Sequence, residues 1–278
     1  MIHLENVTLS YGRRSVLRQL DLSLPAGHVC GLLGENGAGK STLLKCIAGI
    51  LFPDSGTIRV HHFIPGDRHV DFLSDVFFIP EEFTLPSLSI PDYMQLYASF
   101  YRNFDAALFC KLLEDFDVSP QAHLDQLSFG QRKKVFIAFG LASGTRVVLM
   151  DEPTNGLDIP SKSQFRKIIA SAVSEDRCFL ISTHQVRDLD NLIDYLVVLK
   201  DQQIILSEST ASIESRLSFQ LTQDVPEEAL YSESSLRGAL SITRNQMDNE
   251  SPMDIELFFK ALLLHESAIC SVFNQDNN

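Results

Sequence analysis

The sequence predicts an α/β fold with a mainly parallel β-sheet covered by helices on both faces. Two observations carry this prediction. Apolar runs at residues 28–33, 147–150 and 177–182 are typical of buried strands, and segments of helical periodicity follow them. A glycine-rich loop also separates the first of these strands from a helix that begins near residue 40. The 278 residues, 45% of them hydrophobic, allow a large core and roughly two domains.

Charge and cysteine content indicate which partners and which cellular compartment to expect. With 23 basic and 36 acidic residues the net charge is −13, and no run of Lys and Arg is longer than three residues, so we expect no nucleic-acid partner. The scattered cysteines include no Cys-x-x-Cys pair, which indicates reduced core residues of a cytosolic protein. The N-terminus does not resemble a signal peptide and no apolar run could span a bilayer. Any membrane role is therefore expected to come through a partner.

The glycine-rich loop carries the clearest chemistry. Its residues are Gly34, Glu35, Asn36, Gly37, Ala38, Gly39, Lys40, Ser41 and Thr42. A strand, a glycine loop and Gly-Lys-Ser at a helix start are the context of a phosphate-binding P-loop. Backbone N–H groups surround a polyphosphate there, and the helix N-terminus adds its positive end. We expect a bound nucleoside triphosphate, with Lys40 on its β- and γ-phosphates and the Ser41 hydroxyl on Mg²⁺.

Large apolar side chains recur at helical spacing in the middle of the chain: Tyr93, Leu96, Tyr97, Phe100, Tyr101 and Phe104. With a second short helix near residues 108–116, they predict a helical subdomain at about 86–145, inserted in the α/β core. The aromatic face is either plain packing or part of a docking groove for another protein.

The last part of the chain, residues 208–278, predicts a small α+β appendage that regulates, dimerises or docks. We expect strands near 219–221 and 240–242 and helices over 226–231 and 253–265. No catalytic constellation occurs there, so the nucleotide chemistry is assigned to residues 1–207.

Two carboxylates follow the strand at 147–150, where a parallel sheet presents its ligands. Asp151 can hold Mg²⁺ through water, and Glu152 can polarise an attacking water molecule. Upstream of them, Ser128 precedes an apolar helix whose free N–H groups form an anion site. The order and spacing of these motifs relative to the P-loop resemble the nucleotide-binding subunits of ATP-binding cassette (ABC) transporters over residues 1–207.

The resemblance implies a P-loop NTPase core with a mainly parallel sheet, an antiparallel β-subdomain and the inserted helical subdomain. It also implies ATP and Mg²⁺ as ligands. Tyr11 matches the aromatic residue that stacks on adenine, and residues 34–42 match the Walker A loop. Residues 127–131 match the signature motif, which in this family reaches the γ-phosphate of the opposite subunit through Ser128, Gly130 and Gln131.

The remaining family motifs lie in the second half of the domain. Glu152 matches the catalytic glutamate at the end of Walker B. His184 matches the switch histidine, and residues 155–158, with Asp158, match the D-loop. Together with Lys40, Glu152 and His184 are the expected catalytic residues.

Partners also follow from the resemblance. Family members form head-to-tail dimers around two ATP molecules, so a homodimer or a heterodimer with a homologous ATPase subunit is expected. An integral membrane permease subunit would complete the complex, which places this chain in the cytoplasm, peripheral on the inner face of the cell membrane.

Two departures from the family pattern concern the site. Glu81 stands where a glutamine is usual; a carboxylate can ligate Mg²⁺ but cannot donate a hydrogen bond. Phe129 replaces the first signature glycine, while Gly130 is kept. We expect ATPase activity to survive both changes.

Three functions compete at this point. The first is the ATP-hydrolysing subunit of an ABC transporter. Export is favoured, because the sequence of residues 154–158 and the C-terminal appendage resemble those of export-type ATPases. The others are a soluble ABC ATPase that is not coupled to transport and a nucleotide sensor that does not hydrolyse ATP.

Overall fold

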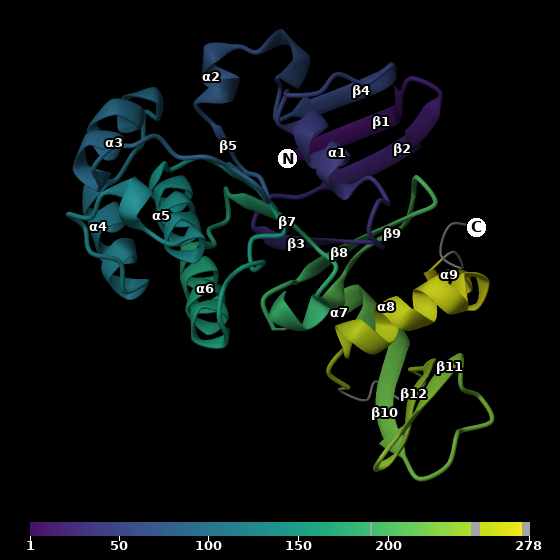
Figure 1. Cartoon of the computed structure of the whole chain (residues 1–278). Helices are drawn as coiled ribbons and strands as arrows, with labels where there is room; N and C mark the ends of the chain where they lie inside the picture. The colour runs from purple at the N-terminus through teal and green to yellow at the C-terminus, as the bar shows by residue number, and fades with distance from the viewer. Residues whose placement is uncertain (190, 246–250, 274–278) are drawn as a thin grey trace.

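The computed structural model describes residues 1–189, 191–245 and 251–273. A six-stranded sheet in the order β5-β6-β7-β3-β8-β9 forms its centre (Figure 1). Its strands are β5 (Val76–Ile79), β6 (Val147–Asp151), β7 (Cys178–Thr183), β3 (His28–Leu33), β8 (Tyr195–Lys200) and β9 (Gln203–Ser209). Every neighbouring pair is parallel except β8 and β9. The mainly parallel sheet that the sequence predicts is therefore confirmed.

Both faces of this sheet are covered, which explains why its strands read as continuous apolar runs. On one face, Cys30 and Leu32 of β3 belong to a core that includes helix α1 (Lys40–Ile47). On the other face, Val29 and Leu33 belong to a core shared with α5 (Phe129–Ala142) and α6 (Ile159–Ala172). Alternate residues of one strand thus enter two different cores.

A second, antiparallel sheet packs over α1 in the order β2-β1-β4. Its strands are β1 (Ile2–Tyr11), β2 (Arg14–Leu24) and β4 (Ser55–Val60). Tyr11 pairs with Arg14 across a tight turn, in which Gly12 has φ +62°. This sheet carries the end of β1, and with it Tyr11, to the P-loop.

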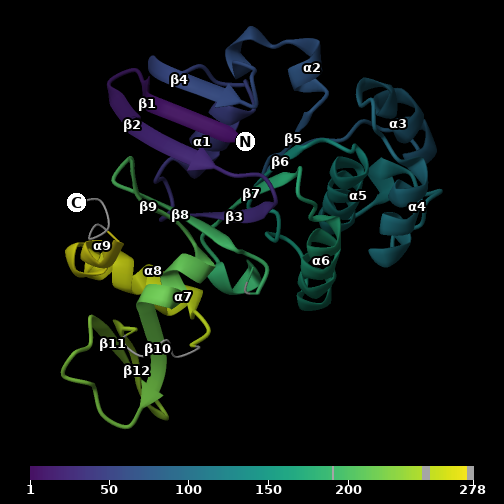
Figure 2. The same cartoon turned by 180° about the vertical axis from the view of Figure 1, so that it is seen from behind.

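The helical part lies beside the β5 edge of the central sheet, away from β9 (Figures 1 and 2). It contains α3 (Ile90–Tyr97), α4 (Ala106–Asp115) and α5. A short helix, α2 (Val70–Leu73), precedes β5. The aromatic helix expected as far as Phe104 is shorter than predicted. It ends at Tyr97, and a 3-10 turn follows at Ala98–Phe100. The rings of Tyr101 and Phe104 instead lie 6.0 and 4.8 Å from that of Phe139, so packing on α5 replaces the helical continuation.

The C-terminal part joins the core through α7 (Thr210–Arg216). It consists of a three-stranded sheet in the order β10-β12-β11 and two helices: β10 (Leu217–Thr222), β11 (Tyr231–Ser235), β12 (Gly238–Arg244), α8 (Ile255–Leu264) and α9 (Glu266–Phe273). The helix expected over residues 226–231 is wrong. Leu230 N–H donates to the carbonyl of Ile242 at 2.8 Å, and Tyr231 pairs with Ile242, so this segment is drawn into the sheet.

Two contacts hold the C-terminal helices against the nucleotide-binding part. Lys200, the last residue of β8, donates to the carbonyl of Leu263 at 3.0 Å and to Glu266 at 2.7 Å. Arg187, in a 3-10 helix that follows β7, pairs with Glu256 of α8. Both anchors lie on chain segments that continue from strands of the central sheet.

Candidate nucleotide-binding site

A cavity of about 410 Å³ opens beside the P-loop. It is lined by Tyr11, Arg14, Val16, Asn36, Gly37, Gly39, Lys40, Ser41, Thr42, Glu81 and Glu152. Seven of the fourteen expected nucleotide-binding positions line it. These residues come from the antiparallel sheet, from the loop between β3 and α1, from the first turn of α1, and from the segments that follow β5 and β6. The central sheet thus presents its carboxyl-terminal edge to the cavity, as open α/β sheets do toward ligands.

The P-loop path requires glycine at two positions. Gly39, the N-cap of α1, has φ +112°, and a Cβ atom on it would lie 2.9 Å from the carbonyl oxygen of Val16. A Cβ atom on Gly34 would lie 2.5 Å from the carbonyl oxygen of Leu199. Since backbone closes on the loop from two sides, a larger residue at either position would displace it.

Lys40 is buried at the floor of the site. Its ammonium group donates to the carbonyls of Gly34 at 2.7 Å and Glu35 at 3.2 Å, and lies 3.9 Å from Oε1 of Glu152. Burial lowers the pKa of Lys40, and the attraction of the nearby carboxylates, Glu152 first, opposes that shift. The lysine is thus a cation placed beside the amides that would surround phosphate.

The carboxylate pair sits where β6 ends. Asp151 is buried, and its Oδ1 accepts a hydrogen bond from the Ser182 hydroxyl at 2.5 Å. Glu152 has a left-handed backbone, φ +46°, and its N–H donates to the carbonyl of Ser182 at 3.2 Å. A positive φ is uncommon outside glycine and marks a turn that the surroundings hold in place. Here the turn brings the Glu152 side chain to the cavity.

His184 follows β7 and reaches the same carboxylate. Its Nδ1 lies 2.8 Å from Oε1 of Glu152. The other oxygen, Oε2, is buried and has no hydrogen-bond partner among the described residues. Glu152 is therefore held by one oxygen while its second oxygen keeps its full capacity to accept a proton or a hydrogen bond.

Glu81 occupies the loop after β5 and lines the cavity. Its Oε1 accepts a hydrogen bond from the side-chain amide of Asn155 at 2.9 Å. With the Ser41 hydroxyl and Asp151 it offers an all-oxygen donor set, which suits Mg²⁺. Within residues 1–189, 191–245 and 251–273, no group of three or more His, Cys, Asp or Glu is placed to hold a metal ion. A set this sparse fits an ion that takes further ligands from phosphates and water.

The signature residues lie apart from this cavity, at the N-terminus of α5. The Ser128 hydroxyl accepts from the N–H of Gln131 at 3.2 Å, while Oε1 of Gln131 accepts from the N–H of Ser128 at 3.0 Å. This reciprocal pair is a capping box. Gly130 faces the next loop, since a Cβ atom there would lie 3.0 Å from the carbonyl oxygen of Gly156.

Four other expected nucleotide-binding residues, Gly34, Glu35, Ala38 and Asp158, do not line the cavity. Asp158 caps α6 by accepting from the N–H of Ser161 at 2.9 Å, and this hydrogen bonding lowers its pKa. Glu35 and Ala38 shape the loop through a hydrogen bond from the N–H of Ala38 to the carbonyl of Glu35 at 3.1 Å.

The structure also shows cavity residues and contacts that the sequence did not predict. Arg14 and Val16 line the cavity because β2 returns beside β1. The tight turn after Tyr11 was the available signal for Arg14. Asn155 bridges Glu81 at 2.9 Å and Gln185 at 3.5 Å. Lys133 donates to the backbone carbonyl of Glu152 at 2.9 Å, a contact that no sequence pattern predicts.

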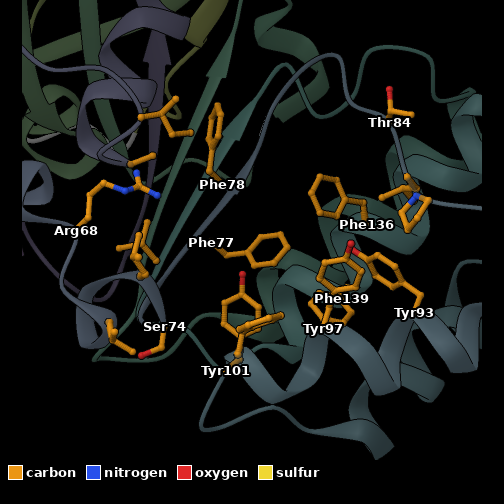
Figure 3. Close-up of a pocket in the computed structure, with 18 residues that line it drawn as sticks. Arg68, Ser74, Phe77, Phe78, Thr84, Tyr93, Tyr97, Tyr101, Phe136 and Phe139 are labelled. Carbon is orange, nitrogen blue, oxygen red and sulfur yellow. The ribbon is translucent and has the colours of Figure 1, made fainter.

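A larger cavity of about 750 Å³, the aromatic groove, lies between α2, β5, α3 and α5 (Figure 3). Its lining includes Phe77, Tyr93, Tyr97, Phe100, Tyr101, Phe136 and Phe139. Figure 3 shows the ring of Phe77 between those of Tyr101 and Phe136, and the ring centroids of these two lie 5.5 and 5.4 Å from that of Phe77. Val70 and Phe100, which also line the groove, are 75% and 64% exposed. The aromatic residues noted in the sequence therefore pack against the core and also line a groove.

None of the described helices, in residues 1–189, 191–245 and 251–273, combines the length and the apolar character needed to cross a membrane.

Comparisons with known proteins agree with this geometry. A family model described as ABC transporter matches residues 17–155. The lantibiotic transport ATP-binding protein SrtF of Streptococcus pyogenes is 30% identical over 212 residues, which cover 75% of this chain and 90% of SrtF. The arabinose import ATP-binding protein AraG 2 of Burkholderia ambifaria is 30% identical over 226 residues, which cover 77% of this chain and 44% of that protein.

A solved structure shows the same fold. The dimeric ATP-binding cassette MJ0796, in a post-hydrolysis state bound to ADP and Pi, has a TM-score of 0.65 and 24% identity, covering 75% of this chain and 98% of that one. The match of the family model, the identity to SrtF and the P-loop cavity lead to one assignment. This chain belongs to the family of ABC transporter ATP-binding subunits.

Proposed function

We propose that this chain binds ATP in the P-loop cavity, hydrolyses it to ADP and phosphate, and so powers transport through a separate membrane subunit. The observation that carries the proposal is the meeting of Lys40, Glu152 and His184 beside one glycine-rich loop. A cation for phosphate, a carboxylate with a free oxygen and a histidine that holds its other oxygen are the groups that this hydrolysis needs.

Binding is assigned to the loop and its rim. The N–H groups of residues 34–42 and the N-terminus of α1 would surround the phosphates. Lys40 would exchange its carbonyl partners for the β- and γ-phosphates. Tyr11, 53% exposed at the mouth of the cavity, would stack on adenine.

Hydrolysis is assigned to Glu152. Its Oε2 would accept a proton from a water molecule as that water forms a bond to the γ-phosphorus, while the bond from this phosphorus to the β–γ bridging oxygen breaks and ADP leaves. His184 would orient the carboxylate through Oε1. Bound through Ser41, Glu81 and Asp151, Mg²⁺ would neutralise phosphate charge.

The second part of each site is assigned to another subunit. Ser128 and Gly130 lie outside the cavity of their own chain, at an exposed helix N-terminus. We place them on the γ-phosphate of a partner in a head-to-tail homodimer or a heterodimer with a homologous ATPase. The dimeric state of the cassette MJ0796 supports this arrangement.

The aromatic groove is assigned to the membrane permease. Exposed apolar side chains gathered in a groove mark a protein interface, and a cytoplasmic segment of the permease with an apolar face would fill it. The chain would then lie on the inner face of the cell membrane. We favour export, because residues 154–158 and the C-terminal appendage resemble those of export-type ATPases.

ATP turnover of the purified chain with Mg²⁺ tests the proposal. We expect Glu152→Gln to lower turnover at least about 100-fold while ATP binding persists, because the amide cannot take the proton. Lys40→Ala should weaken ATP binding itself. Glu82→Gln, an exposed carboxylate next to Glu81, is the matched control and should behave as wild type. Equal, negligible turnover in wild type and Glu152→Gln would favour a nucleotide sensor instead.

A further inference from the structure

Lys133 is a buried cation outside the motifs discussed above. It lies in the second turn of α5 and is fully buried, with 0% exposure. Its ammonium group donates to the carbonyl of Glu152 and to the carbonyl of Asn155, both at 2.9 Å. A single side chain thus links the helix that begins at Ser128 to the turn that carries Glu152.

Burying the ammonium group of Lys133 costs desolvation free energy, which argues that the residue has a specific role. Burial lowers the pKa of Lys133 to about 8, against the attraction of Glu81, Glu152 and Asp151. An ammonium group without water needs several acceptors, and here two carbonyls and the ring of Phe129, 5.6 Å away, supply them. Ile137, one turn further along α5, is buried, which shows that an apolar side chain can fill this face of the helix. A methionine would therefore fill the same space without the desolvation cost.

The two carbonyls lie at either end of one tight turn. Glu152 starts it with φ +46°, and the N–H of Asn155 donates to the carbonyl of Glu152 at 3.2 Å. Lys133 donates to that same carbonyl and to the carbonyl three residues further on. Because left-handed backbone at a non-glycine residue is intrinsically unfavourable, it persists only where surrounding contacts hold it. Lys133 supplies two of those contacts.

The turn also sets the side chains around the cavity. Rotation at Glu152 would move its carboxylate away from His184, now 2.8 Å distant. Movement of Asn155 would release Glu81, whose carboxylate it holds at 2.9 Å. A change in the turn would therefore displace the carboxylates of Glu152 and Glu81, the two acidic residues that line the cavity.

We propose that Lys133 is a positioning residue for ATP hydrolysis: its ammonium group holds the turn at residues 152–155 so that Glu152 faces the attacking water. The proposal rests on the proposed ATPase function. Lys133 does not line the P-loop cavity, and it acts through the backbone carbonyls of Glu152 and Asn155.

The test compares the full-length chain with Lys133→Met and its neighbour Lys134→Met. Lys134 donates to the carbonyl of Phe116 at 3.1 Å, so its removal spares the turn. We expect Lys133→Met to lower kcat by about 10- to 100-fold, since a shift of about 1 Å in a catalytic group has such an effect. The affinity for ATP should stay within about twofold of wild type, because the P-loop contacts are unchanged. Lys134→Met should keep the wild-type kcat.

A second readout follows the turn itself. Amide hydrogen exchange should accelerate in residues 150–158 of Lys133→Met and stay unchanged in Lys134→Met. Lys133→Gln keeps two N–H donors without the charge and should recover part of kcat. It also serves as the test variant should Lys133→Met fail to fold.

The outcomes separate this inference from the function on which it rests. Wild-type kcat in Lys133→Met, or equal losses of kcat and ATP affinity, would overturn the positioning role while leaving the ATPase intact. Wild type that turns over ATP no faster than Glu152→Gln would overturn the proposed function, and the inference with it.

Discussion

Oε1 of Glu152 and Nδ1 of His184 lie 2.8 Å apart, although the two residues follow different strands of the central sheet. Their strands β6 and β7 are parallel neighbours, with Asp151 paired to Ser182. Both side chains therefore emerge at the same edge of the sheet. This contact leaves Oε2 of Glu152 without a partner among the described residues, and it makes the histidine part of the proposed hydrolytic site.

Replacing His184 by alanine should lower ATP turnover by about 100-fold, because Glu152 loses the group that orients it. ATP affinity should change little, since His184 is not among the residues that line the cavity. Steady-state turnover and equilibrium binding of ATP measure the two effects separately. The control is His62→Ala, which removes an exposed histidine that lies far from His184 in the sequence. Undiminished turnover in His184→Ala would contradict the assigned role.

Glu81→Gln restores the residue usual in the family and removes a negative charge from the cavity. The Mg²⁺ concentration for half-maximal ATP turnover should rise by about tenfold, because an amide oxygen is a weaker ligand than a carboxylate. The glutamine side-chain oxygen can still accept the hydrogen bond from Asn155. A titration of turnover with Mg²⁺ measures the change, and Glu82→Gln should leave the curve in place. An unchanged curve for Glu81→Gln would exclude Glu81 as a magnesium ligand.

Phe129 contributes packing where the family has glycine. Its ring is 41% exposed, lies 5.6 Å from that of Phe83 and covers Gly156. Phe129→Ala should lower the free energy of unfolding by about 1–2 kcal/mol, less than a fully buried ring would. Urea denaturation gives this value. For the more exposed Phe100→Ala we expect a loss of at most about 0.5 kcal/mol, and equal losses would contradict the packing role.

Lys133 should make the stability of the chain depend on pH. Its pKa is lowered to about 8 from the ordinary value of 10.5, so the unfolded chain binds more protons between these two pH values. The free energy of unfolding of wild type should therefore rise relative to Lys133→Met as pH increases through this window, by about 2 kcal/mol. Lys40 and the carboxylates are present in both proteins, so their contributions to the pH dependence cancel to first order when the two free energies of unfolding are subtracted.

Urea denaturation from pH 7 to 10, without nucleotide and with a chelator, measures this difference. A constant difference between wild type and Lys133→Met across the window would show that Lys133 keeps its ordinary pKa.

The aromatic groove should bind the permease. Val70→Glu and Phe100→Glu each place a charge on its rim, and the charge would be buried on docking without a partner. Co-purification of the membrane subunit from detergent-solubilised membranes should fall by at least about tenfold, while ATP turnover of the isolated chain stays unchanged. Leu221→Glu changes an exposed apolar residue (53% exposed) on β10 of the C-terminal sheet and is the control. Retention of the permease by both groove variants would place its docking site elsewhere.

Local chemistry explains which features could be predicted from the sequence. The P-loop needs glycines, a lysine and a hydroxyl in consecutive positions, and the buried strands need continuous apolar runs, so both are visible in the order of residues. The parallel sheet and the family follow from the same patterns. Periodicity failed at residues 98–104 and 226–231, because there the contacts of Phe104 with Phe139 and of Leu230 with Ile242 decide the backbone.

Which side chains meet around the loop depends on how the elements pack in the folded chain. Asn155 and Glu81 are 74 residues apart in the chain, and Lys133 and Glu152 are 19 apart. Such pairs form because the strand order and the packing of α5 bring distant segments together, and neither leaves a local pattern. The order of the residues is enough to predict a triphosphate-binding loop in a parallel α/β sheet. The fold decided that Glu152 is held by His184 on one side and by a buried lysine on the other.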